Sequence, residues 1–339
     1  MRELVIGDLH FGVKTNSTTW LEQQIDFFTN QIIPAAKNNN IDRVIFLGDV
    51  FDIRYAINQQ VGIEVKKLVR KLATEFNKEI IFIAGNHDFY SPLEEFIDYN
   101  AYQLIFGDEF LKCYPNVKFI YKEPYLVDGS LCLPWYYTEN PDHFDNILYN
   151  FDFGREVHAV YCHADLSIWP GGRIASLKGV PVYSGHIHNV TEYEYGNLHN
   201  IGSALAMTFS DVNEERFLYI IEDHKIVDTI KNVTTPMFKR VYNDDIFILT
   251  EEDVTNSYMQ ICIANSNFNK ARYIDQLKYL KSTYTDANFR IHIVDDEESN
   301  EVQYNGEGFA TNINEYIENN IPEHLTEKYE IIKERIKTL

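Results

Sequence analysis

The sequence has few cysteines, no long apolar run and a shortage of positive charge. Its 339 residues include four cysteines and no Cys-x-x-Cys pair, which argues against a disulfide framework and favours a reducing, cytoplasmic compartment. No apolar run approaches the roughly 18 residues that a membrane helix needs. The first predicted strand begins at once, so we expect no signal peptide. We therefore expect no membrane association.

The shortage of positive charge restricts the possible partners. Thirty Lys and Arg residues oppose 51 Asp and Glu residues, which gives a formal net charge of −21. Phosphate backbones are bound through clustered Lys and Arg, so the bulk charge of this chain opposes nucleic-acid binding. A nucleic-acid function would need its positive charge from bound metal ions or from a partner subunit.

The residues that are present predict an α/β protein with a sizeable core, because 45% of them are hydrophobic and 14% are aromatic. Helical patterns at about 20–35 and 59–76 alternate with short apolar runs that read as buried strands. Shorter strands are expected at Thr191–Tyr195, Leu198–Ile201 and Arg216–Ile221. The main predicted strands are Glu3–Ile6, Arg43–Leu47, Glu79–Ala84, His158–Tyr161 and Val180–Tyr183.

Charge is distributed unevenly and predicts the domain boundaries. Residues 1–231 carry a net −13, residues 232–294 are neutral, and residues 295–339 carry −8. We predict a main domain at 1–231, a small α/β domain at 232–295, an acidic linker at 296–311 and a helical segment at 312–339. The small domain is expected to have strands at Gln260–Ala264 and Phe289–Val294. The last segment has an apolar stripe that fits either docking on its own core or binding a partner. The stripe consists of Leu325, Tyr329, Ile332, Ile336 and Leu339.

Polar side chains follow five predicted strands at the points where the apolar runs stop. The carboxyl ends of strands in open α/β sheets are ligand sites, so these clusters can converge. Carboxylate oxygen and imidazole nitrogen suit Mn, Fe or Zn. If Asp49 bridges, two ions receive four ligands each, and ions about 3.5–4 Å apart can drive phosphoryl displacement. The candidate ligands are Asp8, His10, Asp49, Asn86, His163, His186 and His188.

Each of these motifs is weak alone, because a lone histidine is more often an ordinary surface or core residue. We predict that the histidines outside the clusters are ordinary surface or core residues. These are His143, His158, His199, His224, His292 and His324.

The ordered series DLH, GDVFD, GNHD, His163 and GHIH resembles the calcineurin-like metallophosphoesterase superfamily. Within it, the chain is similar to SbcD-type nuclease subunits that pair with a coiled-coil ATPase, including those of T-even-like phages. The resemblance implies a layered β-sandwich flanked by helices, a capping domain at 232–295 and a C-terminal helix hairpin. Cys162 stands where the family has glycine, and we expect it to be a small buried filler. Further similar segments are His10–Lys14, Asp49–Arg54, Leu133–Trp135, Ile201–Ser203 and Ile313–Pro322.

The resemblance also implies roles for single residues. One ion would be held by Asp8, His10, Asp49 and His188, and the other by Asp49, Asn86, His163 and His186, with manganese as the usual metal. His87 would donate a proton to the leaving oxygen, and Asp52 would orient the His87 side chain. Lys14 and Arg54 follow motif residues, and either touch DNA phosphate or are ordinary surface cations.

The implied function is Mn-dependent exo- and endonuclease cleavage of DNA in recombination, repair and recombination-dependent replication. The chain would bind an SMC-like ATPase through residues 312–339, as a homodimer within a heterotetramer, in the cytoplasm of a host cell if a phage encodes it. One rival reading is a phosphatase or cyclic-nucleotide phosphodiesterase, which would not need the terminal helices. Another is a non-enzymatic scaffold, which would have no reason to keep all seven ligands.

Overall fold

The computed structural model describes residues 1–91, 93–139, 141–169, 171–193, 197–264, 270–284 and 288–294. The predicted linker 296–311, the predicted helical segment 312–339 and His324 lie outside the described residues. Among the described residues, no helix combines the length and the apolar character needed to cross a bilayer.

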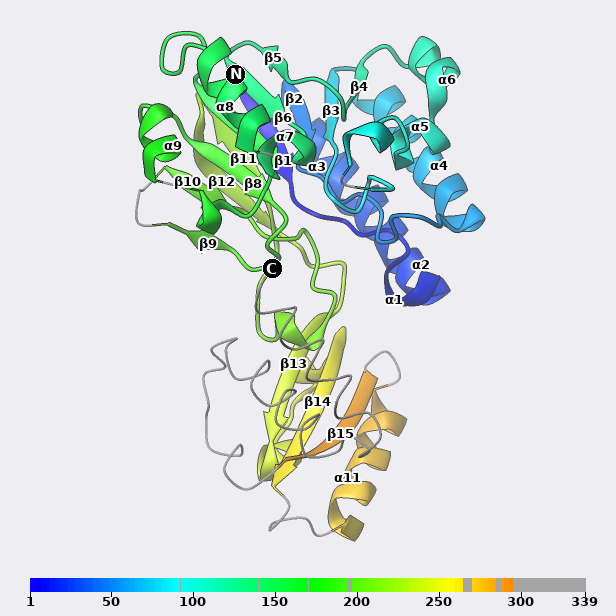
Figure 1. The fold of residues 1–339 in the computed structure, drawn as a ribbon. Coiled ribbons are helices and arrows are strands. Elements are labelled where there is room, and N and C mark those ends of the chain that lie inside the picture. Colours follow the sequence, from blue (N-terminus) through cyan, green and yellow to red (C-terminus); the bar gives the residue numbers. More distant parts are fainter. Residues whose placement is uncertain are drawn as a thin grey trace, which may run out of the picture.

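Two six-stranded sheets stack in the large domain (Figure 1). In the first sheet, the order is β12 (Lys225–Lys231), β11 (Phe217–Glu222), β1 (Arg2–Ile6), β2 (Arg43–Phe46), β3 (Glu79–Ile83) and β4 (Val117–Ile120). In the second sheet, it is β5 (Tyr125–Val127), β6 (Ser130–Leu133), β7 (Ala159–His163), β8 (Val182–Gly185), β10 (Leu198–Asn200) and β9 (Thr191–Glu192).

One hydrophobic cluster lies between the two sheets. It joins Val5, Ile45 and Ile81 of the first sheet to Tyr161 and Tyr183 of the second. Because side chains alternate along a strand, the residues between these point outward, where helices cover them. The described helices of this domain are α1 (Val13–Asn16), α2 (Thr18–Phe27), α3 (Ile33–Asn38), α4 (Gln59–Phe76), α5 (Ala101–Ile105), α6 (Gly107–Cys113), α7 (Trp135–Glu139), α8 (Pro141–Asn150) and α9 (Gly171–Ser176).

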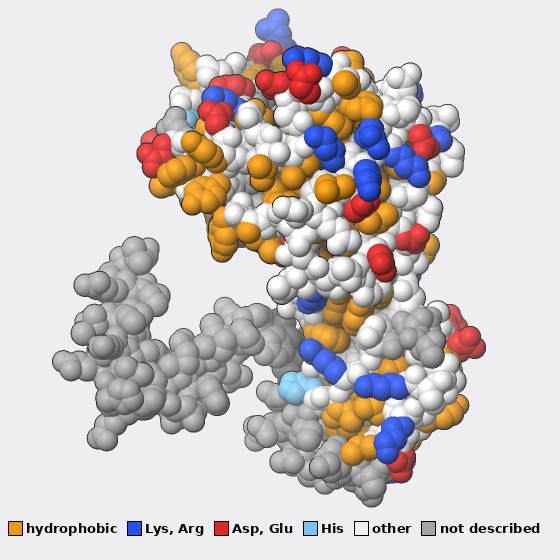
Figure 2. Space-filling view, turned by 90° about the vertical axis from the view of Figure 1, so that its right-hand side faces the viewer, with side chains coloured by type: hydrophobic (Ala, Val, Ile, Leu, Met, Phe, Trp, Pro, Cys, Tyr) orange, Lys and Arg blue, Asp and Glu red, His pale blue; other side chains and the backbone are white. Residues whose placement is uncertain are grey.

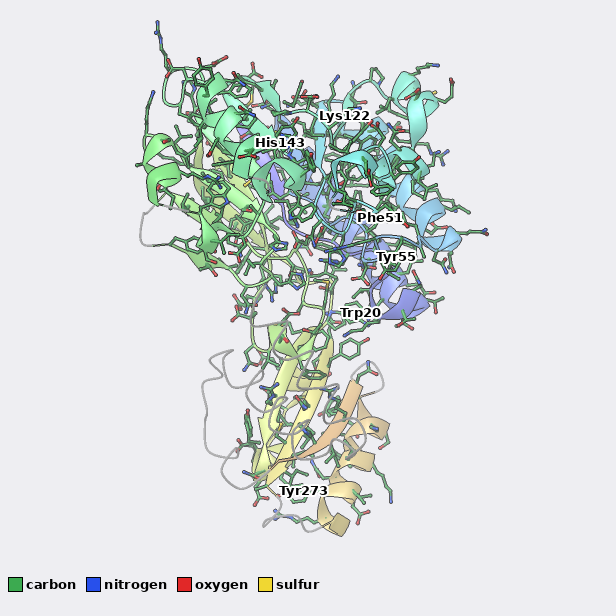
Figure 3. All side chains as sticks on the ribbon, viewed as in Figure 1. Trp20, Phe51, Tyr55, Lys122, His143 and Tyr273 are labelled. Carbon is green, nitrogen blue, oxygen red and sulfur yellow. The ribbon has the colours of Figure 1, made fainter. Side chains whose placement is uncertain are left out.

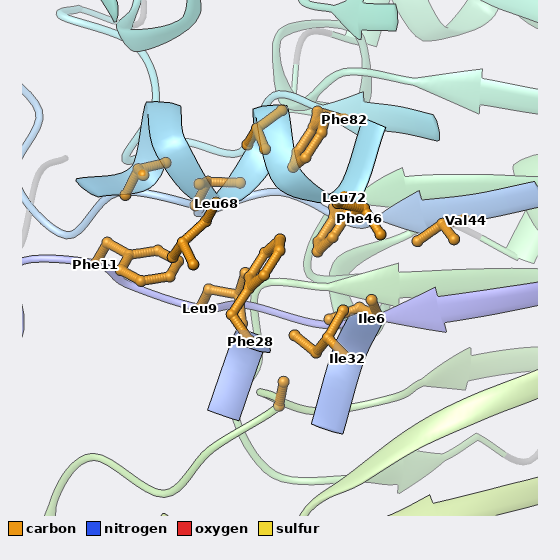
Figure 4. Close-up of a cluster of buried hydrophobic side chains, with 14 of the residues drawn as sticks. Ile6, Leu9, Phe11, Phe28, Ile32, Val44, Phe46, Leu68, Leu72 and Phe82 are labelled. Atoms are coloured by element: carbon orange, nitrogen blue, oxygen red, sulfur yellow. The ribbon is translucent and has the colours of Figure 1, made fainter. Parts of the chain in front are cut away.

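The helix α4 shows how the sequence fixes an outer layer. Asn58 caps it by accepting a hydrogen bond from the Gln60 amide at 2.8 Å. Val61, Val65 and Leu68 recur at helical spacing and are buried against the first sheet. Figure 4 shows this layer, in which Phe46 and Phe82 stack with ring centroids 4.2 Å apart.

A third sheet of three parallel strands forms the small domain. Its order is β13 (Met237–Tyr242), β14 (Ser257–Ala264) and β15 (Asn288–Val294), and α10 (Glu251–Val254) and α11 (Lys270–Thr283) belong to the same unit. Trp20 of α2 lies at the junction with the large domain (Figure 3), where it stacks on Phe238 and Tyr258. The predicted boundary near residue 231 falls between β12 and β13.

The layered α/β sandwich predicted from the sequence is confirmed. The five main predicted strands are present as β1, β2, β3, β7 and β8. The predicted helix at 20–35 is two helices, α2 and α3, joined by a π-helical turn at Phe28–Ile32. The strand β12 was not predicted, because its residues are almost all exposed and show no alternation of apolar and polar residues. The strands β4, β5, β6 and β13 and the helices α1 and α5 to α10 were not predicted either.

Candidate metal centre

The two sheets bring the predicted ligands together because of strand direction. The strands β1, β2 and β3 run parallel in one sheet, and β6, β7 and β8 run parallel in the other. Their carboxyl ends therefore meet at one edge of the sandwich. His163 is the last residue of β7, and the other six predicted ligands lie in the loops that follow β1, β2, β3 and β8. All seven lie in two adjoining clusters.

The first cluster contains Asp8, His10 and His188. Nε2 of His10 lies 3.2 Å from Nε2 of His188, and both nitrogens lie 3.9 Å from Oδ2 of Asp8. The second cluster contains Asn86, His163 and His186. Oδ1 of Asn86 lies 2.9 Å from Nε2 of His163 and 3.0 Å from Nδ1 of His186.

Asp49 lies between the two clusters and presents one oxygen to each. Its Oδ2 is 3.6 Å from Nε2 of His10, and its Oδ1 is 3.4 Å from Nε2 of His163. Nδ1 of His163 lies 2.8 Å from the carbonyl oxygen of Leu47, so this nitrogen carries the proton and Nε2 presents a lone pair to the centre. This arrangement suits a carboxylate shared by two cations.

The donor set fits a pair of divalent ions. Carboxylate and imidazole ligand atoms form overlapping groups of three, and within each group they lie within 4.8 Å of one another. The Asn86 amide adjoins them at His163 and His186, and no thiolate is among these donors. Such oxygen and nitrogen donors suit Mn, Fe or Zn. Cys162 is buried in the hydrophobic cluster with Leu131 and Phe144, as expected of a small filler.

Protonation in this centre follows from burial and from the shared carboxylates. Burial disfavours the charged form of His163, but Asp49 and Asp8 outweigh it and raise the pKa of His163 to about 9. Burial raises the pKa of Asp8 to about 6 and lowers the pKa values of His186 and His188 to about 4. The buried carboxylates thus favour positive charge beside them, which a divalent ion would supply in place of a proton.

The loops around the centre adopt unusual backbone conformations. His10, Asp49 and His186 have φ values of +45°, +46° and +82°, in the left-handed region that costs energy for residues with a side chain. Gly85 allows close approach, because a Cβ atom there would lie 2.2 Å from Oδ1 of Asp49. At Gly185, it would lie 2.4 Å from Oδ1 of Asp8.

His87 lies beside the clusters. Its amide donates to Oδ1 of Asp49 at 2.8 Å, and its ring centroid lies 4.9 Å from that of His10. Asp52, which is predicted to orient His87, contacts it through the backbone. The backbone carbonyl of Asp52 contacts Nδ1 of His87, whereas its carboxylate lies 3.2 Å from Nδ1 of His10. The reason is that the Asp52 amide donates to the carbonyl of Phe11 at 3.1 Å, which fixes this loop against the segment that carries His10.

The two predicted DNA-contacting cations have different positions. The end of the Asn86 amide that faces away from His163 and His186 lies 2.5 Å from Nη2 of Arg54, so Arg54 borders the centre. Lys14 instead lies over the ring of Phe238, with Nζ 5.9 Å from the ring centroid, and so points toward the small domain.

Two further residues, Asp88 and Arg216, support the centre and were not predicted from the sequence. Asp88 is fully buried and accepts hydrogen bonds from the amides of Gly85 and Phe51 and from the hydroxyl of Tyr102. It ties together the loops that carry Asn86 and Asp49, and its place in the GNHD motif was a usable signal.

Arg216 donates to the carbonyl of His188 and forms an ion pair with Asp211 at 3.0 Å. It supports the loop that carries His188. No signal in the sequence marked it, since 27 residues separate Arg216 from His188 and it belongs to none of the motifs.

Comparison with known proteins agrees with this geometry. The family described as calcineurin-like phosphoesterase matches residues 1–196. The chain is 28% identical over 334 residues to "Exonuclease subunit 1" of Enterobacteria phage T4, which covers 95% of this chain and 94% of that protein. It is 29% identical over 119 residues to "DNA double-strand break repair protein Mre11" of Sulfurisphaera tokodaii, which covers 35% of this chain and 28% of that protein. Because the family match spans more than half of the chain, this protein belongs to the calcineurin-like phosphoesterase family, as a metal-dependent hydrolase of phosphate esters.

Proposed function

We propose that this protein is a Mn²⁺-dependent nuclease that hydrolyses DNA phosphodiester bonds as an exo- and endonuclease. The observation that carries the proposal is the similarity to a phage exonuclease subunit over nearly the full length of both chains. This similarity extends beyond the phosphoesterase match, which ends at residue 196. The full set of donors in the two clusters weighs against a scaffold that has lost its metals.

Asp8, His10, Asp49 and His188 are proposed to hold one ion, and Asn86, His163 and His186 to hold the second together with Asp49. The two-sided placement of the Asp49 carboxylate supports its bridging role. When bound, the ions supply an activated water and neutralise the charge on the phosphate oxygens.

His87 is proposed as the general acid. Its contact to the Asp52 carbonyl requires the proton on Nδ1, so Nε2 remains to pass a proton to the leaving sugar oxygen. Asp52 then acts twice, through its carbonyl on His87 and through its carboxylate on His10. Arg54, beside Asn86, is proposed to contact the phosphate that is cleaved, and Lys14 a phosphate nearer the small domain.

The proposed partner is an SMC-like coiled-coil ATPase, which binds residues 312–339. The proposed setting is DNA recombination, repair and recombination-dependent replication in the cytoplasm of a host cell. Two names support parts of this setting, since one relative is a phage exonuclease subunit and the other is named for repair of double-strand breaks. Deleting residues 312–339 should abolish co-purification with the ATPase while the isolated Mn²⁺ nuclease activity persists. If the truncated chain still binds the ATPase tightly, the assigned segment is wrong.

A homodimer is proposed through the face that α4 and α5 present. Large apolar side chains are exposed there, with Ile63 55% exposed, Tyr99 65% and Leu104 72%. Figure 2, which faces this side of the molecule, shows hydrophobic side chains among Lys and Arg in its upper part. Apolar surface of this kind marks interaction sites on soluble proteins. Sedimentation of Leu104→Glu against the wild type tests the assignment, since the variant should be monomeric.

The experiment that tests the nuclease function compares substrates. The purified chain should cleave single- and double-stranded DNA with Mn²⁺, and more strongly with the ATPase present. Hydrolysis of small phosphoesters without cleavage of DNA, with or without the ATPase, would favour the phosphatase or cyclic-nucleotide phosphodiesterase reading. No hydrolysis of any phosphoester, in a chain that binds no manganese, would favour a scaffold.

A further inference from the structure

Two buried amide side chains lie beside the two histidines of the first cluster. They are Gln24 on α2 and Asn200 on β10, and only 1% of the surface of each is exposed. Each directs its NH2 group at two backbone carbonyls next to one histidine. Neither residue is among the predicted ligands, and we call the pair the amide clamps.

Gln24 holds the backbone of the segment that carries His10. Its Nε2 donates to the carbonyl oxygens of Leu9 at 2.6 Å and of His10 at 3.0 Å. The segment lies beyond the end of β1, and the φ of His10 is +45°, outside the range of a strand. Buried carbonyls need donors, and Gln24 supplies one to each of these two.

The covalent connection between His10 and α2 does not favour the observed position by itself. Lys14, Thr15 and Asn16 have φ values of +57°, +58° and +59°. Three successive residues in the left-handed region cost energy, most of all the β-branched Thr15. The contact from Gln24 therefore sets where His10 lies relative to the helix.

Asn200 holds the segment that carries His188 in the same way. Its Nδ2 donates to the carbonyl oxygens of Ile187 and Asn189, at 2.7 Å each. These two carbonyls lie on either side of His188 in the chain, and the carbonyl of His188 itself accepts from Arg216. Three successive carbonyls are thus fixed by buried side chains.

The oxygen atom of each amide clamp is unpaired. Among the described residues, Oε1 of Gln24 and Oδ1 of Asn200 are buried without a hydrogen-bond partner. A buried glutamine elsewhere uses both ends, since Nε2 of Gln31 donates to the Lys231 carbonyl and its Oε1 accepts from the Val233 amide. An unpaired buried oxygen lowers stability, and an apolar side chain of the same size would avoid that cost. The two amides are therefore explained by the carbonyls that they hold.

The ligands of the second cluster are held in another way. His163 belongs to β7 and pairs in register with Gly185 of β8, and its carbonyl accepts from Oγ1 of Thr138 at 2.8 Å. Asp88 ties down the loop of Asn86. Removal of an amide clamp should therefore affect the first cluster alone.

We propose that the amide clamps are positioning residues that hold His10 and His188 at the spacing one ion needs. They thereby set the affinity for that ion separately from the affinity for the other ion. This inference deepens the proposed two-ion nuclease function and rests on it. The Nε2 atoms of the two histidines lie 3.2 Å apart. Two nitrogens that each lie about 2.1 Å from a shared ion, at nearly a right angle, are about 3 Å apart, so the clamps keep the spacing that a shared ion requires.

Manganese binding tests the proposal. Gln24→Met and Asn200→Leu each remove one amide at nearly constant volume, and Mn²⁺ titrations of each variant are followed by electron paramagnetic resonance. In the wild type, two ions about 3.5–4 Å apart should couple magnetically. In either variant the weakened site should bind Mn²⁺ about 10–100-fold less tightly, so one uncoupled bound Mn²⁺ should accumulate before the coupled pair forms. Wild-type coupling at every Mn²⁺ concentration in both variants overturns the proposal.

The matched controls remove the same groups elsewhere. Gln31→Met takes a buried amide from the turn that follows α2. Asn116→Leu takes an amide that donates to two carbonyls, those of Ala73 and Lys78, at 3.1 Å each. Asn116 precedes β4 and so lies at the edge of the first sheet opposite the metal centre. Both controls should keep the wild-type affinities, and equal weakening in a control would also overturn the proposal.

Amide hydrogen exchange in EDTA gives a readout that needs no metal. The amide of His10 donates to the carbonyl of Asp49 at 2.9 Å, so its exchange reports how firmly the segment is held. Exchange should be about 5–10-fold faster in Gln24→Met, the effect of losing one buried hydrogen bond, and unchanged in Gln31→Met. Wild-type exchange in Gln24→Met overturns the proposal.

The same measurement at residues 187–189 tests Asn200→Leu, with Asn116→Leu as its control. If Asn200→Leu misfolds by thermal melting, Gln24→Met alone decides the proposal. If the wild type binds no Mn²⁺, the proposed two-ion function fails, and the exchange measurement still shows whether the amide clamps hold the two histidine segments.

Discussion

Replacing Gly85 with alanine should disrupt the metal centre through a single methyl group. The added Cβ would lie 2.2 Å from Oδ1 of Asp49 and 2.4 Å from its backbone nitrogen, well inside van der Waals contact. The loop after β3 or the Asp49 backbone must then move by about 1 Å to reach contact distance. Neither moves freely, because Asp88 holds the amides of both Gly85 and Phe51.

The expected magnitudes follow from these contacts. Overpacking of this kind typically costs about 1–3 kcal/mol of unfolding free energy, measurable by urea denaturation in EDTA. Displacement of the bridging carboxylate should weaken Mn²⁺ binding by about 10–100-fold, the range for lost ligand orientation, measurable by calorimetric titration.

Gly172→Ala is the matched control, because an added Cβ atom there would have no other atom within 4 Å and its φ is unstrained. Its position inside α9 makes alanine neutral or slightly stabilising. Wild-type Mn²⁺ affinity in Gly85→Ala would refute the reasoning, since it would show that the loop tolerates a side chain beside Asp49.

Three further substitutions test the support of the centre and the core. Asp88→Ala leaves several buried donors without an acceptor and should lower the unfolding free energy by about 2–4 kcal/mol in urea denaturation. Arg216→Ala should weaken Mn²⁺ binding about 10–100-fold by releasing the His188 loop, whereas Arg155→Ala at an exposed position should not. Equal Mn²⁺ affinities of Arg216→Ala and the wild type would contradict the role of Arg216. Phe82→Ala should cost about 3–5 kcal/mol because Phe82 is almost fully buried in the stack, against less than about 0.5 kcal/mol for Tyr149→Ala, which is 89% exposed.

Much of the fold and of the centre could be predicted from the sequence because both depend on local patterns. Buried parallel strands are apolar runs, and the residues just after them must lie at one edge of the sheet. Asp8, Asn86 and His186 could therefore be placed together without knowledge of distances. The glycines of the same motifs also carried information, since Gly85 and Gly185 lie against the Asp49 and Asp8 carboxylates.

The features that could not be predicted depend on contacts between segments that are distant in the sequence or on exposed edges of the sheet. Whether the carboxylate or the carbonyl of Asp52 meets His87 is decided by a backbone hydrogen bond to Phe11, which no spacing reveals. Arg216 supports His188 through contacts between distant segments. The exposed edge strand β12 lacks alternation, so its pattern resembles a loop.

The net negative charge argues against nucleic-acid binding, but part of it belongs to the metal centre. The buried carboxylates of Asp8 and Asp49 belong to a centre that suits two divalent cations. The remaining charge of the chain is strongly negative, so a low overall affinity for DNA is expected of the isolated chain.

DNA cleavage by His87→Ala, with its metal content measured in the same preparation, tests the central claim most directly. We predict that the wild type cleaves DNA with Mn²⁺ and that the variant keeps two Mn²⁺ per chain but loses about 10²-fold or more in kcat. Cleavage at the wild-type rate by the variant, or loss of a metal ion together with the imidazole, would contradict the account of a two-ion nuclease with His87 as its acid.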